Sequence, residues 1–181
     1  MQIKRVVTAV DEQGRSVVQE EGELELVEPE LFAGYGMWLV WGTEGALQMP
    51  APIGTEPALR PFFPGPGGTR FGVFSLPPEP RDAPPAGPPD EESLQRTVAE
   101  AEELLPGMLS VFEPDHPGMH TTPTIDYDIV IKGTLTLELD DGVEVELPPG
   151  TAIVQNGTRH AWHNYGAETA IMAYVIVDAR A

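Results

Sequence analysis

The C-terminal half of the chain is patterned as a series of short strands, and this pattern limits the fold more than any other feature. Apolar and polar residues alternate over 134–140 and again over 143–147, which is the period of a half-buried strand. Asp141-Gly142 separates the two runs and favours a tight hairpin turn. Further strands are expected at 151–155, 159–164 and 169–178, the last apolar on both faces and therefore central. Strands at this spacing predict an all-β sandwich or barrel.

Three more strands are expected before residue 50, over 3–10, 16–19 and 35–41, where β-branched and aromatic residues are frequent. Thirteen of the 20 prolines then fall between Pro50 and Pro89. Because each proline removes a backbone donor and favours an extended residue before it, this region is expected to be a solvated loop over a sheet, with one strand at 70–76. A lid or an oligomerisation arm is the alternative.

One helix is expected at 91–105, since Asp90 can cap its N-terminus and Pro106-Gly107 ends it. Its apolar stripe at helical spacing consists of Leu94, Val98, Ala101 and Leu105. A chain of 181 residues has the length of one domain. We therefore expect a single domain over 1–181, composed of N-terminal strands (1–49), a Pro-rich loop region (50–90), the helix (91–105) and a barrel core (108–178).

Two polar stretches of the barrel region resemble the paired motifs of a known superfamily. The first reads HTTPTID from His120 to Asp126 and runs on to Gly133, and the second reads QNGTRH from Gln155 to His160. In order and spacing they are similar to the two conserved motifs of the cupin superfamily. Over residues 108–178 this resemblance implies an antiparallel, jelly-roll-like barrel, the double-stranded β-helix.

The resemblance also implies a metal, when one is present, at the open end of the barrel between the two motifs. Cupin metal sites usually have three His and one Glu, but this chain has Thr122 at the second His position and Asp126 at the Glu position. The remaining donors are His120, Asp126 and His160, which strand alternation can bring together. Two His and one carboxylate form the ligand set of mononuclear Fe(II) oxygenases, and they also suit Mn, Ni or Zn. The expected cofactor is thus a divalent metal ion.

Substrate contacts are expected from residues beside these donors: Thr122, Gln155, Trp162 and Asn164. Thr122 and Gln155 would donate hydrogen bonds, and Trp162 would form an apolar wall. Alternation places His163 on the opposite face from His160, while His116 is interpreted as an exposed turn residue. With no cysteine in the chain, any metal must be held by nitrogen and oxygen ligands.

Three hypotheses for function remain open at this stage. The first is a metal-dependent cupin enzyme that acts on a small oxygenated or carboxylated molecule as an oxygenase, decarboxylase or lyase. The second is a metal-free module that binds a small molecule without catalysis. The third is a metal-free catalyst with His160 or His120 as general base and Asp126 as its orienting partner.

Charge and composition exclude other classes. The chain has 10 Lys and Arg against 29 Asp and Glu, a formal charge of -19, so it lacks the basic patch that nucleic acids require. It shows neither a signal-peptide pattern nor an apolar run of membrane-spanning length, and a cytoplasmic protein without membrane contact is expected. The cupin resemblance also implies a homodimer formed through the N-terminal strands.

Overall fold

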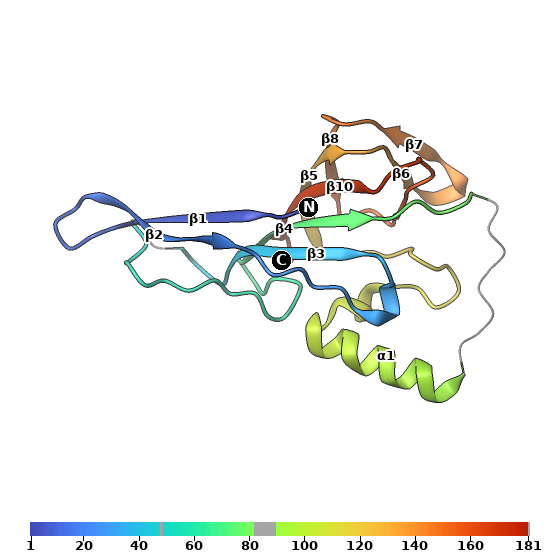
Figure 1. Cartoon of the computed structure of the whole chain (residues 1–181), viewed down its shortest axis with the longest axis horizontal. Coiled ribbons are helices and arrows are strands. Elements are labelled where there is room, and N and C mark those ends of the chain that lie inside the picture. The colour runs from blue at the N-terminus through green and yellow to red at the C-terminus, as the bar shows by residue number, and fades with distance from the viewer. Residues whose placement is uncertain (48, 82–89, 181) are drawn as a thin grey trace.

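The computed structural model describes residues 1–47, 49–81 and 90–180, and it confirms the all-β fold (Figure 1). Its larger antiparallel sheet has the strand order β3-β4-β10-β5-β8, and its smaller sheet has the order β7-β6-β9. The bounds of the larger sheet's strands are Gly36–Thr43 (β3), Thr69–Leu76 (β4), Ala170–Asp178 (β10), Thr124–Lys132 (β5) and Ala152–Asn156 (β8). Those of the smaller sheet are Glu144–Leu147 (β7), Leu135–Glu138 (β6) and Ala161–His163 (β9). Together the sheets form an antiparallel barrel of the double-stranded β-helix type that the motif resemblance implies.

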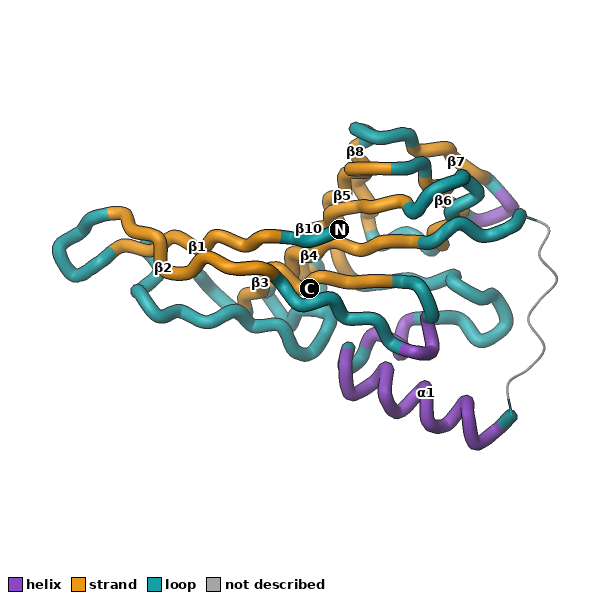
Figure 2. Tube along the Cα trace, in the orientation of Figure 1, coloured by secondary structure: helices purple, strands orange, loops and turns teal. Residues whose placement is uncertain are grey.

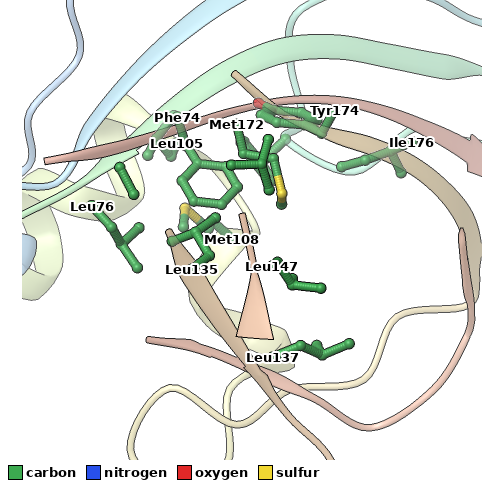
Figure 3. Packing of buried hydrophobic residues seen from close by; sticks show 13 residues of the cluster. Phe74, Leu76, Leu105, Met108, Leu135, Leu137, Leu147, Met172, Tyr174 and Ile176 are labelled. Carbon is green, nitrogen blue, oxygen red and sulfur yellow. The ribbon is translucent and has the colours of Figure 1, made fainter. Parts of the chain in front are cut away.

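The two sheets face each other across an apolar core. Leu135 and Leu137 of β6 belong to one core cluster with Met172 and Tyr174 of β10 and Phe74 of β4 (Figure 3). Leu135 has no exposed surface and Met172 is 1 % exposed. Leu135 and Leu137, two positions apart on β6, thus both reach the barrel core, as the alternation in the sequence predicts.

The hairpin and the central strand expected from the sequence are both confirmed. Asp141 and Gly142 have φ of 58° and 70°, the left-handed pair that a tight turn between β6 and β7 requires. They lie in a short 3-10 turn, η3 (Asp140–Gly142). Strand β10 pairs with β4 on one side and β5 on the other, so it lies in the middle of the larger sheet.

A two-stranded ribbon, β1 (Lys4–Val10) and β2 (Ser16–Glu23), extends away from the barrel (Figures 1 and 2). The strand expected at 70–76 is present as β4, and loop connects it to β3 (Figure 2). Residues 82–89 of the Pro-rich region lie outside the described residues. In the part of the chain that is described, there is no helix long and apolar enough to cross a membrane.

The helix α1 (Glu91–Leu104) begins as expected, since the Asp90 carboxylate accepts a hydrogen bond from the backbone N–H of Ser93 at 2.9 Å. The apolar stripe expected at helical spacing is buried only in its second half. Ala101 and Leu105 are 1 % exposed, but Leu94 and Val98 are 41 % and 38 % exposed. The main contacts of the helix with the body are with two 3-10 turns, η1 (Glu30–Phe32) and η2 (Met108–Val111).

Candidate functional site

The two sequence motifs meet at a pair of histidines. His120 and His160 form an isolated antiparallel bridge in which each backbone N–H donates to the other's carbonyl, at 2.9 and 3.0 Å. Their ring centroids are 4.2 Å apart. The ring of Phe112 lies against His120, and Trp162 meets His160 edge-on. The backbone pairing thus fixes both imidazoles side by side at one end of the barrel.

Hydrogen bonds define which ring nitrogen of each histidine is free. Nδ1 of His120 lies 2.9 Å from the carbonyl oxygen of Gly118, and Nδ1 of His160 lies 2.8 Å from that of Thr158. A carbonyl can only accept, so both Nδ1 atoms carry the proton and both Nε2 atoms keep a lone pair when the ring is neutral. Among the described residues, nothing hydrogen-bonds to either Nε2.

Both imidazoles are held in the neutral form. Burial lowers the pKa of His120. Burial, and to a lesser extent the neighbouring His120, lowers the pKa of His160 to about 4. Neutral imidazoles with a free Nε2 and an anchored Nδ1 are the form in which histidine binds metal ions.

Two carboxyl groups follow on the interior side of β5. Asp126 lies opposite Gln155 of β8, and Asp128 lies opposite Tyr174 of β10. Burial raises the pKa of both carboxyls, that of Asp128 to about 7 with a further contribution from the charge of Asp126. The interior of the barrel thus contains acidic groups as well as neutral imidazoles.

Three buried polar atoms in this region have no hydrogen-bond partner among the described residues: Oδ1 of Asp126, Oδ2 of Asp128 and Nε2 of Gln155. Each such atom costs roughly 1–3 kcal/mol if it stays unpaired, and buried polar groups in native proteins nearly always have a partner. Their clustering on neighbouring positions of β5 and β8 therefore points to water, a metal or a ligand inside the barrel.

The structure brings the expected ligand set together only in part. His120 and His160 are in contact, but Asp126 does not complete a three-donor group with them. Across residues 1–47, 49–81 and 90–180, no three His, Asp or Glu side chains are gathered closely enough to hold a metal ion. Two neutral imidazoles with free Nε2 atoms fit a divalent ion. To complete a three-ligand site, either the Asp126 carboxylate moves towards the histidines or a water molecule takes the third position.

The residues expected to touch substrate take different positions. Gln155 is 4 % exposed, and its Oε1 accepts from the Thr158 hydroxyl, which leaves only Nε2 free. The Thr122 hydroxyl accepts from that of Thr124 at 2.8 Å. Thr122 and Thr124 also line an open cleft of about 580 Å³. Trp162 packs against the core cluster beside Phe74, so one edge of the site has an apolar wall.

Asn164 does not fit the expected role in substrate binding. Its side chain is fully buried, its Nδ2 donates to the carbonyls of Leu76 and Glu168, and its Oδ1 accepts from Gly166 N–H. All three hydrogen bonds go to backbone that closes the end of the barrel. Three of the four hydrogen-bonding positions of the amide are taken and the side chain has no exposed surface, so we assign it a structural role.

The other two histidines lie outside this pair, His163 on the face opposite His160 as alternation predicts and His116 in a turn. His163 lies between Glu79 and Glu138, with Nδ1 and Nε2 at 2.8 and 2.7 Å from the two carboxylates. His116 is exposed in its turn, 3.4 Å from Glu113. Asp128 was not predicted as a site residue, although alternation puts it on the same interior face as Asp126. The sequence pattern that could have identified Asp128 is an acidic residue between Tyr127 and Ile129 in a barrel strand.

Comparison with known proteins gives short segments of similarity, and no family model matches the chain. The chain is 36 % identical over 83 residues to oryzines biosynthesis cluster protein J of Aspergillus oryzae, covering 42 % of this chain and 46 % of that protein. It is 46 % identical over 64 residues to phomopsin biosynthesis cluster protein C' of Diaporthe leptostromiformis, or 34 % of this chain and 33 % of that one. The cupin-domain-containing oxidoreductase virC of Hypocrea virens is 35 % identical over 65 residues, 34 % of each chain. The matches span a third to about half of these relatives.

Solved structures that align with the chain include a putative ethanolamine utilization protein Q of Salmonella typhimurium, at 10 % identity and a TM-score of 0.44 over 99 % of both chains. Another is an RmlC-like cupin with a double-stranded β-helix from Methanocaldococcus jannaschii, at 13 % identity and a TM-score of 0.37, covering 61 % of this chain and 71 % of that one. At these TM-scores the similarity to solved structures adds no evidence for the fold, which we assign from the strand order and the two motifs.

Proposed function

We propose that this protein, a cupin by its fold and its two motifs, binds a divalent metal ion at His120 and His160 and acts there on a small oxygenated or carboxylated molecule. The observation that carries the proposal is the shared state of the two imidazoles. Each is neutral, each is anchored through Nδ1 to a backbone carbonyl, and each leaves Nε2 free. The names of the cupin-domain oxidoreductases that it resembles favour an oxygenase among the three reaction classes.

In this proposal the chain supplies the ligands and an oriented pocket. His120 and His160 would hold the ion, and Asp126, whose Oδ1 has no partner among the described residues, is the proposed third ligand. When bound, the ion supplies Lewis-acid or redox chemistry to an oxygen of the substrate. Gln155 Nε2, which has no partner among the described residues, would donate a hydrogen bond to the substrate, and Trp162 would limit the access of water from one side.

A metal-free small-molecule-binding module is the second candidate. It is favoured by the separation of Asp126 from the histidine pair, since no three-donor group forms in the described parts of the chain. Here His120, His160, Asp126 and Gln155 would bind the ligand by hydrogen bonds alone. This candidate needs no rearrangement of β5.

Metal binding separates the two candidates. Protein purified without chelating resin is stripped with a chelator and titrated by calorimetry with Fe(II) without oxygen, and with Mn(II), Ni(II) and Zn(II). The proposal predicts one bound equivalent for wild type, and a loss of more than about 100-fold in affinity for His120→Ala and His160→Ala, since loss of a ligand costs more than loss of a supporting partner.

His116→Ala is the matched control, because this histidine is exposed and lies outside the pair. It should bind metal as wild type does. Asp126→Asn tests the third ligand: weaker binding supports its coordination, and unchanged binding restricts the site to the two histidines and water. If none of the four ions binds stoichiometrically, the metal proposal is overturned and the metal-free module is the remaining candidate.

A further inference from the structure

Two cross-strand rows of the larger sheet face the barrel interior, and they contain acidic side chains without partners. The strand registers give these rows as Arg70, Ile176, Asp126 and Gln155, and as Gly72, Tyr174, Asp128 and Ile153. Asp128 is 7 % exposed, and its Oδ2 has no hydrogen-bond partner among the described residues. Because burial of a polar group without a partner costs free energy, packing alone does not account for this residue.

The polar side chains that could partner Asp128 within these rows are directed elsewhere. Tyr174 lies opposite Asp128 in the register, but its hydroxyl lies over Gly72, on the other side of β10, where an added Cβ would be 2.3 Å from it. The guanidinium of Arg70 is engaged by one carboxylate and three backbone carbonyls outside the rows, those of Glu44, Thr43, Pro61 and Thr69. The sheet thus directs neither the phenol nor the guanidinium at Asp128.

Gln155 gives a second, independent indication of a ligand in the same interior. Its side chain is 4 % exposed, its Oε1 accepts from the Thr158 hydroxyl, and its Nε2 has no partner among the described residues. It lies opposite Asp126, two residues and therefore about 7 Å nearer than Asp128 to the end of β5 that follows His120. A ligand along the barrel axis would thus meet an N–H donor first and the Asp128 carboxyl at greater depth.

We propose that Asp128 binds a protonated amine of the ligand, and that an oxygen of the same ligand lies nearer the histidines and accepts a hydrogen bond from Gln155 Nε2. This inference rests on the proposed function in that the barrel interior is the binding site. It narrows the substrate class from an oxygenated or carboxylated molecule to a small amine that carries a hydroxyl or carbonyl oxygen.

Charge favours an amine over other groups at this depth. A carboxylate would add a third acidic group beside Asp126 and Asp128, and like charges at short range repel. A hydroxyl could donate to Asp128, but hydrogen bonds between an ammonium group and a carboxylate are about twice as strong as neutral ones. The formal charge of -19 on the whole chain acts in the same direction, since it attracts cations and repels anions.

Three small probes of matched shape test the proposal: isopropanolamine, propylene glycol and lactate. They share a methyl and a hydroxyl group and differ in having an amine, a second hydroxyl or a carboxylate. Each is titrated at neutral pH into the full chain, stripped of metal so that lactate cannot bind by chelation, and binding is followed by NMR shifts of backbone amides. Wild type should bind isopropanolamine at least about 10-fold more tightly than propylene glycol, and lactate more weakly than either.

Asp128→Asn keeps the shape of the side chain and removes its charge. It should lose about 10-fold in affinity for isopropanolamine and leave propylene glycol nearly unchanged. Because the carboxyl is unpaired without ligand, this variant should be at least as stable as wild type in urea, which a structural role for Asp128 would not give. Gln155→Met removes the Nε2 donor and should weaken both probes while keeping their order.

The matched control is Asp141→Asn, which removes one exposed carboxylate from the β6–β7 turn and so changes the net charge equally. It should bind all three probes as wild type does. The proposal is overturned if wild type does not bind isopropanolamine, if it binds the three probes equally, or if Asp128→Asn keeps the preference for the amine. The last result would mean attraction to the acidic chain in general. The metal titration is a separate measurement, so failure of the amine site and failure of the metal site are distinguishable.

Discussion

Replacement of Asn164 by alanine should destabilise the fold strongly while leaving the histidine pair intact. The amide is completely buried and makes three hydrogen bonds to backbone groups, two of them within the β9–β10 connection and one at the end of β4. At a net value of about 1 kcal/mol for each bond, the loss is about 3 kcal/mol, and the buried groups left unpaired add to it. We expect a decrease of roughly 3–5 kcal/mol in the free energy of unfolding.

Urea unfolding followed by far-UV circular dichroism measures this change, provided that the dependence on urea concentration is the same in both proteins. For a chain of this size the expected shift in Tm is roughly 6–20 °C, from about 2–4 °C for each kcal/mol. Asn156→Ala is the control, because Asn156 is an exposed asparagine on β8, and it should change stability by less than about 0.5 kcal/mol.

The reasoning fails if Asn164→Ala costs less than about 1 kcal/mol, the value of a single hydrogen bond. It also fails if the variant keeps its stability but loses affinity for metal or ligand. That result would restore the role in substrate binding that the sequence motif predicts for this residue.

Three further changes probe the barrel. Leu135→Ala removes a fully buried core side chain and should cost about 2–5 kcal/mol in urea unfolding; a cost below that of an exposed residue would contradict the described packing. Gly133→Ala should be more destabilising than Gly142→Ala: both have positive φ, but a Cβ at Gly133 would lie 2.7 Å from the backbone of Ala170, whereas Gly142 has open space around it. The hydrogen bond from Arg159 lowers the pKa of Glu113, so this pair stabilises the fold above the ordinary pKa of the carboxyl and loses that effect as pH falls through the lowered one. Glu113→Gln should therefore make Tm slightly less sensitive to acid in thermal melts, and an unchanged pH dependence would show that the pair adds no stability.

Local patterns in the sequence predict the elements that depend on near neighbours in the chain. The alternation in β6 and β7 and the Asp141-Gly142 turn follow from strand period and backbone conformation, and the structure has both. The N-cap at Asp90 is likewise a local interaction. These features need no knowledge of the rest of the chain, which explains why they could be predicted.

Features that depend on distant packing could not be predicted in the same way. The stripe of α1 has the correct helical period, but Leu94 stays exposed, whereas Ala101 and Leu105 near the end of the helix are buried. The motif position of Asn164 gave no indication that Leu76, 88 residues away in the chain, would take its amide. Alternation puts Asp126 on the interior face of β5, yet it cannot measure the separation of this carboxylate from the two histidines.

The state of the two imidazoles tests the central claim most directly, and long-range ¹H–¹⁵N correlation spectra of the four histidine rings report it. At neutral pH the account predicts that His120 and His160 are neutral with the proton on Nδ1, and that one equivalent of Zn(II) shifts their Nε2 resonances alone. His116 and His163 should not change. A proton on Nε2 of either member of the pair, or zinc shifts confined to the other two histidines, would contradict the account.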